Sequence, residues 1–103
     1  MTFSDCWIRK AGEPVPEELG AKFKFGNLGV LPGPHHYWVP AVREWAEAVG
    51  LPIEWKDSDW LVIRATPAQV SAFLEHIYGP EGAAERIASL DAGAMYDIIA
   101  EEF

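Results

Sequence analysis

The stretch from Ile53 to Gln69 constrains the fold most, because it joins a hairpin signal directly to a helix start. Two apolar, β-branched and aromatic runs, 53–56 and 60–65, flank the polar turn Asp57-Ser58-Asp59, which predicts two antiparallel strands. Thr66-Pro67-Ala68-Gln69 then forms a capping box, the signature of a helix N-terminus. A hairpin followed by a capped helix favours a mixed α+β chain.

Helical periodicity appears both before and after this hairpin. A helix over 40–49 is predicted by one apolar stripe, with Pro40 in its first position and Gly50 as its left-handed end. That stripe is Val42, Trp45, Ala46 and Val49. The capped helix has the stripe Val70, Phe73, Leu74 and Ile77 and should end at Gly79-Pro80. Segments 82–90 and 92–102 are interpreted as two further helices or one kinked helix, with Ile87, Leu90, Met95, Ile98 and Ile99 facing inward.

The N-terminal part is less regular and contains two short candidate strands, at 6–9 and 22–25. The predicted order is therefore ββαββαα, an α+β fold with a small antiparallel or mixed sheet and helices packed on one face. We expect a single domain over 1–103, in which 1–38 is the irregular part and 39–103 holds the hairpin and helices. At 103 residues, half of them hydrophobic, such a domain folds without a metal, a disulfide or a cofactor.

The cysteine content and the hydropathy of the chain indicate the cellular compartment in which the protein is expected. Cys6 is the single cysteine, so an intramolecular disulfide and a multi-cysteine zinc site are excluded, and a reducing, cytoplasmic compartment is expected. The N-terminus lacks a signal-peptide pattern, and no run approaches eighteen apolar residues. We therefore expect no membrane partner.

The charge is strongly negative, at −8, and unevenly distributed. Residues 52–103 carry 10 of the 16 acidic residues but only 3 of the 8 basic ones. A surface of this kind repels phosphate, so direct nucleic-acid binding is not expected. Two interpretations remain, solubility alone or complementarity to a basic protein surface.

Connection lengths suggest that three segments meet at one end of the domain. The short link Gly50-Leu51-Pro52 returns the chain along helix 40–49, and Ala65-Thr66-Pro67 returns the next helix toward the same end. The expected group contains all three histidines of the chain. Its members are His35, His36, Tyr37, Trp38, Asp57, Asp59, Trp60, Glu75, His76 and Tyr78, the candidate partner-binding residues.

Catalytic and metal chemistry have weaker support from the sequence. Imidazoles and carboxylates at one end suit a divalent metal, but adjacent histidines diverge and the chain has no HExxH pattern. Cys6 has no activating motif, and the paired carboxylates are in turns or near a terminus. We therefore name no catalytic residue, metal ligand or cofactor, and expect a protein without enzymatic activity.

Five tryptophans are many for this length, and they bear on the choice between core and interface. Trp7, Trp45 and Trp55 are interpreted as core residues. Tyr37, Trp38 and Trp60 border polar loops, so they either form an exposed recognition patch or close the end of the core.

The function that these observations favour is an acidic, non-enzymatic binding protein that occupies a basic surface of a partner protein. Immunity proteins for toxins and phage-encoded blockers of defence machinery are of this kind. Two alternatives stay open. One is a small-ligand or metal-binding domain at the histidine-rich end. The other is a regulatory or oligomerising subunit, possible as a homo-oligomer, that docks through acidic C-terminal helices in 81–103.

Overall fold

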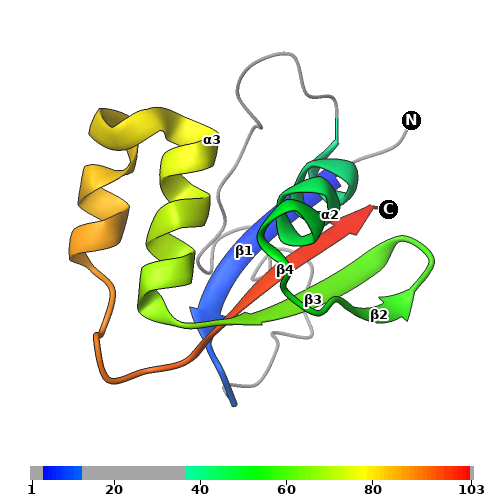
Figure 1. Ribbon diagram of the computed structural model, residues 1–103. Coiled ribbons are helices and arrows are strands. Elements are labelled where there is room, and N and C mark those ends of the chain that lie inside the picture. The colour runs from blue at the N-terminus through cyan, green and yellow to red at the C-terminus, as the bar shows by residue number, and fades with distance from the viewer. Residues whose placement is uncertain (1–3, 13–36, 103) are drawn as a thin grey trace.

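The computed structural model describes residues 4–12 and 37–102, which form a four-stranded antiparallel sheet and two helices (Figure 1). The strand order is β1-β4-β3-β2. The expected strand 22–25 and the two histidines at 35 and 36 lie outside the described residues. In chain order the elements are β1 (Ser4–Lys10), α2 (Trp38–Val49), β2 (Glu54–Asp57), β3 (Trp60–Ala65), α3 (Pro67–Ala88) and β4 (Tyr96–Glu102).

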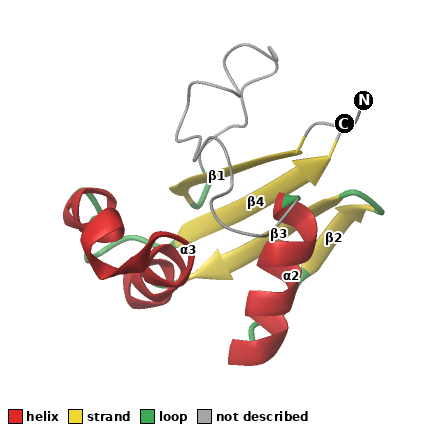
Figure 2. Ribbon diagram, turned by 90° about the horizontal axis from the view of Figure 1, so that it is seen from above, coloured by secondary structure: helices red, strands yellow, loops and turns green. Residues whose placement is uncertain are grey.

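The α+β class is confirmed, with helices packed on one face of the sheet (Figure 2). The core consists of the buried residues of α2 and α3 and of alternate residues of β1, β3 and β4. Trp45 of α2 meets Phe73 of α3 edge to face, with ring centroids 5.0 Å apart, and so joins the two helices. The N-terminal strand β1 belongs to the same sheet, because it pairs with β4 over its whole length.

The first helix begins two residues earlier than the sequence predicted. Pro40 is therefore the third helical residue, where its missing N–H is still harmless because the first four N–H groups have no partner within the helix. Gly50 ends α2 at φ 77°, and its N–H donates to the carbonyls of Ala46 and Glu47. Val49, expected on the apolar stripe, is exposed in the last helical position.

The hairpin and the capping box are confirmed. β2 and β3 pair antiparallel with a bulge between Trp55 and Asp57. At the start of α3, the Gln69 N–H donates to the Thr66 hydroxyl at 3.2 Å, and the Thr66 N–H donates to the Gln69 side-chain oxygen at 2.9 Å. Two N–H groups that would otherwise lack partners are thus satisfied.

The helix α3 is bent where the sequence predicted its end. Gly79 has φ 79° and ψ 164°, a conformation reserved for glycine, and Pro80 follows it. The chain then resumes helical geometry to Ala88 and turns back beside the first half (Figure 1). Ala83 of the second half is fully buried in the core. The expected helix over 82–90 is therefore present, two residues shorter at its end.

The expectation of a helix over 92–102 is wrong, because Tyr96–Glu102 is the strand β4 between β1 and β3. Both faces of this strand are covered, so Ile98 and Ile99 are both buried although they point to opposite sides. A short apolar run of this kind cannot be distinguished from a buried helical turn by periodicity. Removal of the chain after Gly79 would therefore delete a central strand of the sheet as well as the second half of α3.

Candidate functional site

Two of the three segments expected to meet do share one end of the sheet. The N–H of Trp38, at the start of α2, donates to the Ser4 hydroxyl at 3.2 Å. Ser4 lies opposite Glu102, whose N–H donates to the Asp59 carbonyl at 2.8 Å. The start of α2 and the β2–β3 turn are therefore linked through the ends of β1 and β4.

The third segment does not join them. In both views α3 stands at the end of the sheet where β3 finishes, opposite the β2–β3 turn (Figures 1 and 2). Glu75 and His76 are exposed on this helix. Tyr78 is half-buried with the Arg86 guanidinium 4.3 Å from its ring centroid, and burial raises its pKa. The helix leaves the sheet steeply, whereas connection length alone suggested a return along β3.

The structure places Trp38 in the core, one of the two alternatives that the sequence left open, and differs from the expectation at Trp55. Trp38 is 1% exposed and belongs to the core, while Tyr37 beside it is 42% exposed. Trp60 is half-buried. Trp55, expected in the core, is 46% exposed. It does face the helical side of the sheet, because it pairs with the buried Leu61, but β2 is an edge strand.

The face of the sheet opposite the helices is here called the outer face. On it, a row of charged side chains lies next to a row of apolar ones. Neighbouring strands place Arg9, Asp97 and Arg64 side by side in one row. The next row is apolar and contains Trp7, Ile99 and Val62. Burial on this face decreases from β1 and β4 toward β2. The accessible part of the outer face therefore lies over β3 and β2.

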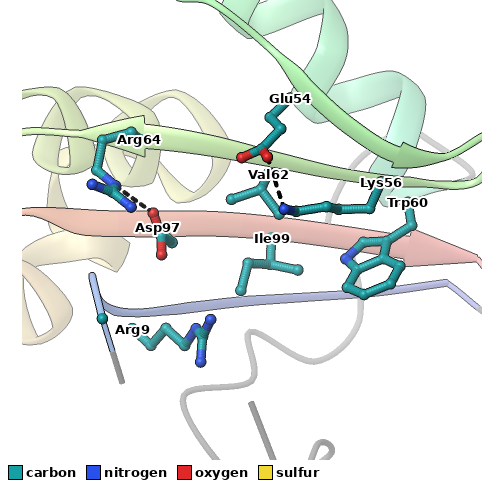
Figure 3. A pocket seen from close by; sticks show the side chains of 9 residues that line it. Arg9, Glu54, Lys56, Trp60, Val62, Arg64, Asp97 and Ile99 are labelled. Carbon is teal, nitrogen blue, oxygen red and sulfur yellow. Dashed lines mark hydrogen bonds and ion pairs between the residues drawn. The ribbon is translucent and has the colours of Figure 1, made fainter. Parts of the chain in front are cut away.

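A pocket of about 410 Å³ occupies this part of the outer face (Figure 3). Its apolar floor is formed by the cross-strand pair Val62 and Ile99, and the Trp60 ring stands at one end. Charged side chains from all four strands surround the floor. The pocket is lined by Arg9, Gly12, Glu54, Lys56, Trp60, Val62, Arg64, Asp97 and Ile99.

Two ion pairs organise the rim of the pocket. Arg64 Nε donates to Asp97 Oδ1 at 2.7 Å across β3 and β4, and Lys56 Nζ donates to Glu54 Oε1 at 2.7 Å within β2. Trp60 Nε1 is buried and has no hydrogen-bond partner among the described residues. Of the residues that line this pocket, the sequence predicted only Trp60 as a candidate site residue. A further local signal was Arg64, a charged residue inside an otherwise apolar strand.

Cys6 lies on the other face, in the core, and is fully buried. Burial, and then the neighbouring Asp5 carboxylate, raise the pKa of the thiol well above its usual value. A thiol in this state is a poor nucleophile at neutral pH. Among residues 4–12 and 37–102, no group of three or more His, Cys, Asp or Glu side chains could hold a metal ion.

The fold and the charged rim of the outer-face pocket define a small α+β protein with a candidate ligand-binding pocket. No known protein family, no curated protein and no solved structure matches the chain. None of the helices formed by the described residues has the length and apolar character needed to cross a membrane.

Proposed function

We propose that the protein is a non-enzymatic binding module that occupies a basic surface of a partner protein through its β2–β3 hairpin. The observation that carries this proposal is the exposure of Trp55 on the same hairpin as Asp57 and Asp59, which are both exposed. Neither aspartate forms an ion pair within the described part of the chain. One aromatic anchor flanked by unpaired carboxylates has the composition of a protein-binding hot spot for a basic partner.

The balance of exposed charges supports the same proposal. Four basic side chains of the described residues are exposed, and each is engaged, because Lys10 pairs with Asp91, Lys56 with Glu54, Arg64 with Asp97, and Arg86 covers Tyr78. Exposed carboxylates that form no ion pair with another described residue lie on α2, on the hairpin and on α3. They are Glu44, Glu47, Asp57, Asp59, Glu75, Glu81 and Glu85.

Within this class, we propose a cytoplasmic blocker of a phosphate-binding site, comparable in action to immunity proteins or phage-encoded inhibitors. Carboxylates of the hairpin would stand where phosphates otherwise bind, and Trp55 would supply the apolar contact. An attraction of this kind acts at long range, so association is fast at low salt and slows as salt screens the charges.

The test is affinity capture from an extract of the source cells, followed by kinetics with the partner identified by mass spectrometry. We expect one basic protein, retained at low salt, whose association rate falls steeply between about 0.05 and 0.5 M salt. Trp55→Ala should weaken its affinity at least about ten-fold. The double variant Asp57→Asn/Asp59→Asn should lower the association rate more than it raises the dissociation rate.

The matched control is Glu81→Gln/Glu85→Gln, which removes the same charge from exposed positions on α3. It should change the association rate less than the hairpin variant does. If the two double variants lowered the association rate equally, the rate would depend on the net charge of the chain and not on the position of the carboxylates, which would contradict the proposal. No basic partner, or a partner bound equally by Trp55→Ala, would contradict the proposal.

A further inference from the structure

We propose that the pocket on the outer face binds a small carboxylate that carries a flat apolar group. The Trp55 side chain is separate from this site, because it faces the opposite side of the sheet from the pocket. Its volume of about 410 Å³ falls within the range of small-ligand pockets, roughly 300–1,000 Å³.

The charge of the pocket differs from that of the chain. Three of the eight basic residues line it, namely Arg9, Lys56 and Arg64, against two carboxylates. The described part of the lining thus holds more cationic than anionic side chains, in a chain of net charge −8. A negatively charged ligand is attracted to these cationic groups and repelled by the carboxylates that predominate in the chain.

Arg64 is the residue best placed to hold the anion. Its Nε is bound to Asp97, which fixes the guanidinium on the rim of the pocket (Figure 3). Its two terminal nitrogens have no hydrogen bond to a described residue, and 60% of the side chain is exposed. These two nitrogens form the donor pair that a carboxylate accepts in a bidentate manner.

At the Trp60 end of the pocket, a ligand is expected to present a hydrogen-bond acceptor and an apolar group. Trp60 Nε1 is a buried donor without a partner among the described residues, and Figure 3 shows this nitrogen on the side of the ring toward Ile99. A buried donor of this kind costs folding free energy until an acceptor reaches it. Val62 is half-buried between Trp60 and Arg64 on β3 and offers the apolar contact, with the buried Ile99 beside it on β4.

The spacing of these groups sets the shape of the ligand. Trp60 and Arg64 are four residues apart on one face of β3, so their Cα atoms are separated by roughly 13 Å. The Trp60 ring lies toward Ile99 and shortens the gap, whereas the Arg64 side chain extends toward Asp97 (Figure 3). A phenyl ring on a two-carbon chain that ends in a carboxylate spans such a site, with the ring against Val62 and Ile99.

The test is a titration of the isotope-labelled full chain with 3-phenylpropionate, followed by the NMR signals of the Trp60 indole N–H and the Arg64 Nε–H. We expect saturable shifts of both signals with a dissociation constant on the order of 1 mM. The neutral isostere 3-phenylpropanamide should bind at least about five-fold more weakly, because it lacks the charge. Propionate, which lacks the ring, should bind more weakly than the full probe.

Two variants and one matched control complete the experiment. Arg64→Gln should weaken binding of 3-phenylpropionate at least about five-fold. A second probe, 3-(4-hydroxyphenyl)propionate, has a phenol oxygen that can accept from Trp60 Nε1 and should bind about three-fold more tightly than 3-phenylpropionate. Trp60→Phe, which keeps a ring but removes the donor, should abolish this gain and leave binding of 3-phenylpropionate unchanged. Arg86→Gln removes an exposed arginine of α3 that does not line the pocket and should leave binding unchanged. Trp55→Ala should also leave it unchanged, so a failure here is distinct from a failure of the hairpin proposal.

The result that would overturn the inference is the absence of saturable shifts at Trp60 and Arg64 in the folded wild-type chain. Equal affinities for the acid and the amide would show apolar adsorption and contradict it as well. If Arg64→Gln does not fold, Lys56→Gln is substituted in its place. Lys56 is exposed and pairs with an exposed partner, so this change leaves the fold intact and should weaken binding by a smaller factor.

Discussion

Arg64 Nε lies 2.7 Å from Asp97 Oδ1, and the two residues are directly opposite each other in the register of β3 and β4. The pair is unequal, since the Arg64 side chain is 60% exposed and that of Asp97 is 7% exposed. The arginine therefore keeps most of its hydration, whereas the aspartate depends on protein partners. Loss of the arginine leaves a carboxylate that water reaches poorly.

The first prediction concerns the stability that this pair contributes. Arg64→Met, which keeps the apolar stem, should lower the free energy of unfolding by about 1–2 kcal/mol. Asp97→Asn should cost a similar amount, and the double variant less than the sum, because the two changes remove one interaction. Urea denaturation of the four proteins provides the measurement.

Lys56→Met is the matched control, because it removes an ion pair of the same 2.7 Å length in which both side chains are exposed. It should change the free energy of unfolding by less than about 0.5 kcal/mol. A loss as large as that of Arg64→Met would mean that burial of Asp97 is not the cause.

The second prediction separates two tryptophans that the sequence ranked in the opposite order. Trp38→Ala should lower the free energy of unfolding by about 3–5 kcal/mol, because the side chain is 1% exposed within the core. Trp55→Ala should cost less than about 1 kcal/mol, since 46% of Trp55 is already exposed. Chemical denaturation measures both, and similar losses would contradict the placement of β2 at the edge of the sheet.

The sequence predicted those parts of the fold that depend on local signals. The capping box at Thr66, the hairpin turn at 57–59 and the glycine end at Gly50 involve residues within a few positions of each other. β4 was missed because a strand covered on both faces has no period-2 pattern. Trp55 was misplaced for a related reason. The alternation of polar and apolar residues around Trp55 predicted the correct face of the sheet. Whether a helix covers that face at β2 depends on the order of the strands.

The pocket depends on strand order even more strongly. Arg9, Arg64 and Asp97 are far apart in sequence, and only the order β1-β4-β3 puts them in one row. The shared end at Trp38 and Asp59 was predicted from short connections, which limit the direction of a returning chain. The same reasoning failed for α3, because a short link fixes where a helix starts but not the angle at which it leaves.

The third prediction concerns the bend in α3. Gly79→Ala should lower the free energy of unfolding by about 1–3 kcal/mol, because φ 79° with ψ 164° is strained for any residue with a Cβ. The cost is one of backbone conformation, since an added Cβ would meet no atom within 4 Å. Thermal and urea denaturation measure the loss.

Gly93→Ala is the control for that prediction. Gly93 has no positive φ, and an added Cβ would lie 3.5 Å from the Asp91 side chain, an ordinary contact. This change should alter the free energy of unfolding by less than about 1 kcal/mol, in the stabilising direction. A large loss at position 93 and none at 79 would contradict the assigned bend.

The fourth prediction concerns the alkaline side of the stability profile and follows from the buried Cys6 thiol. Burial raises its pKa in the folded chain, whereas in the unfolded chain it ionises near pH 8.5, about the value of a free cysteine. Between these two pKa values the unfolded state has lost the proton and the folded state keeps it. The contribution of Cys6 is therefore fully present below about pH 8.5 and falls by up to about 1.4 kcal/mol per pH unit above it.

The variant Cys6→Ala has no such group, so its free energy of unfolding should decline less steeply from about pH 8.5 to 9.5, a window below the ordinary tyrosine range. Urea denaturation at a series of pH values measures the two slopes, and parallel slopes would show that the thiol is not shielded in the native state.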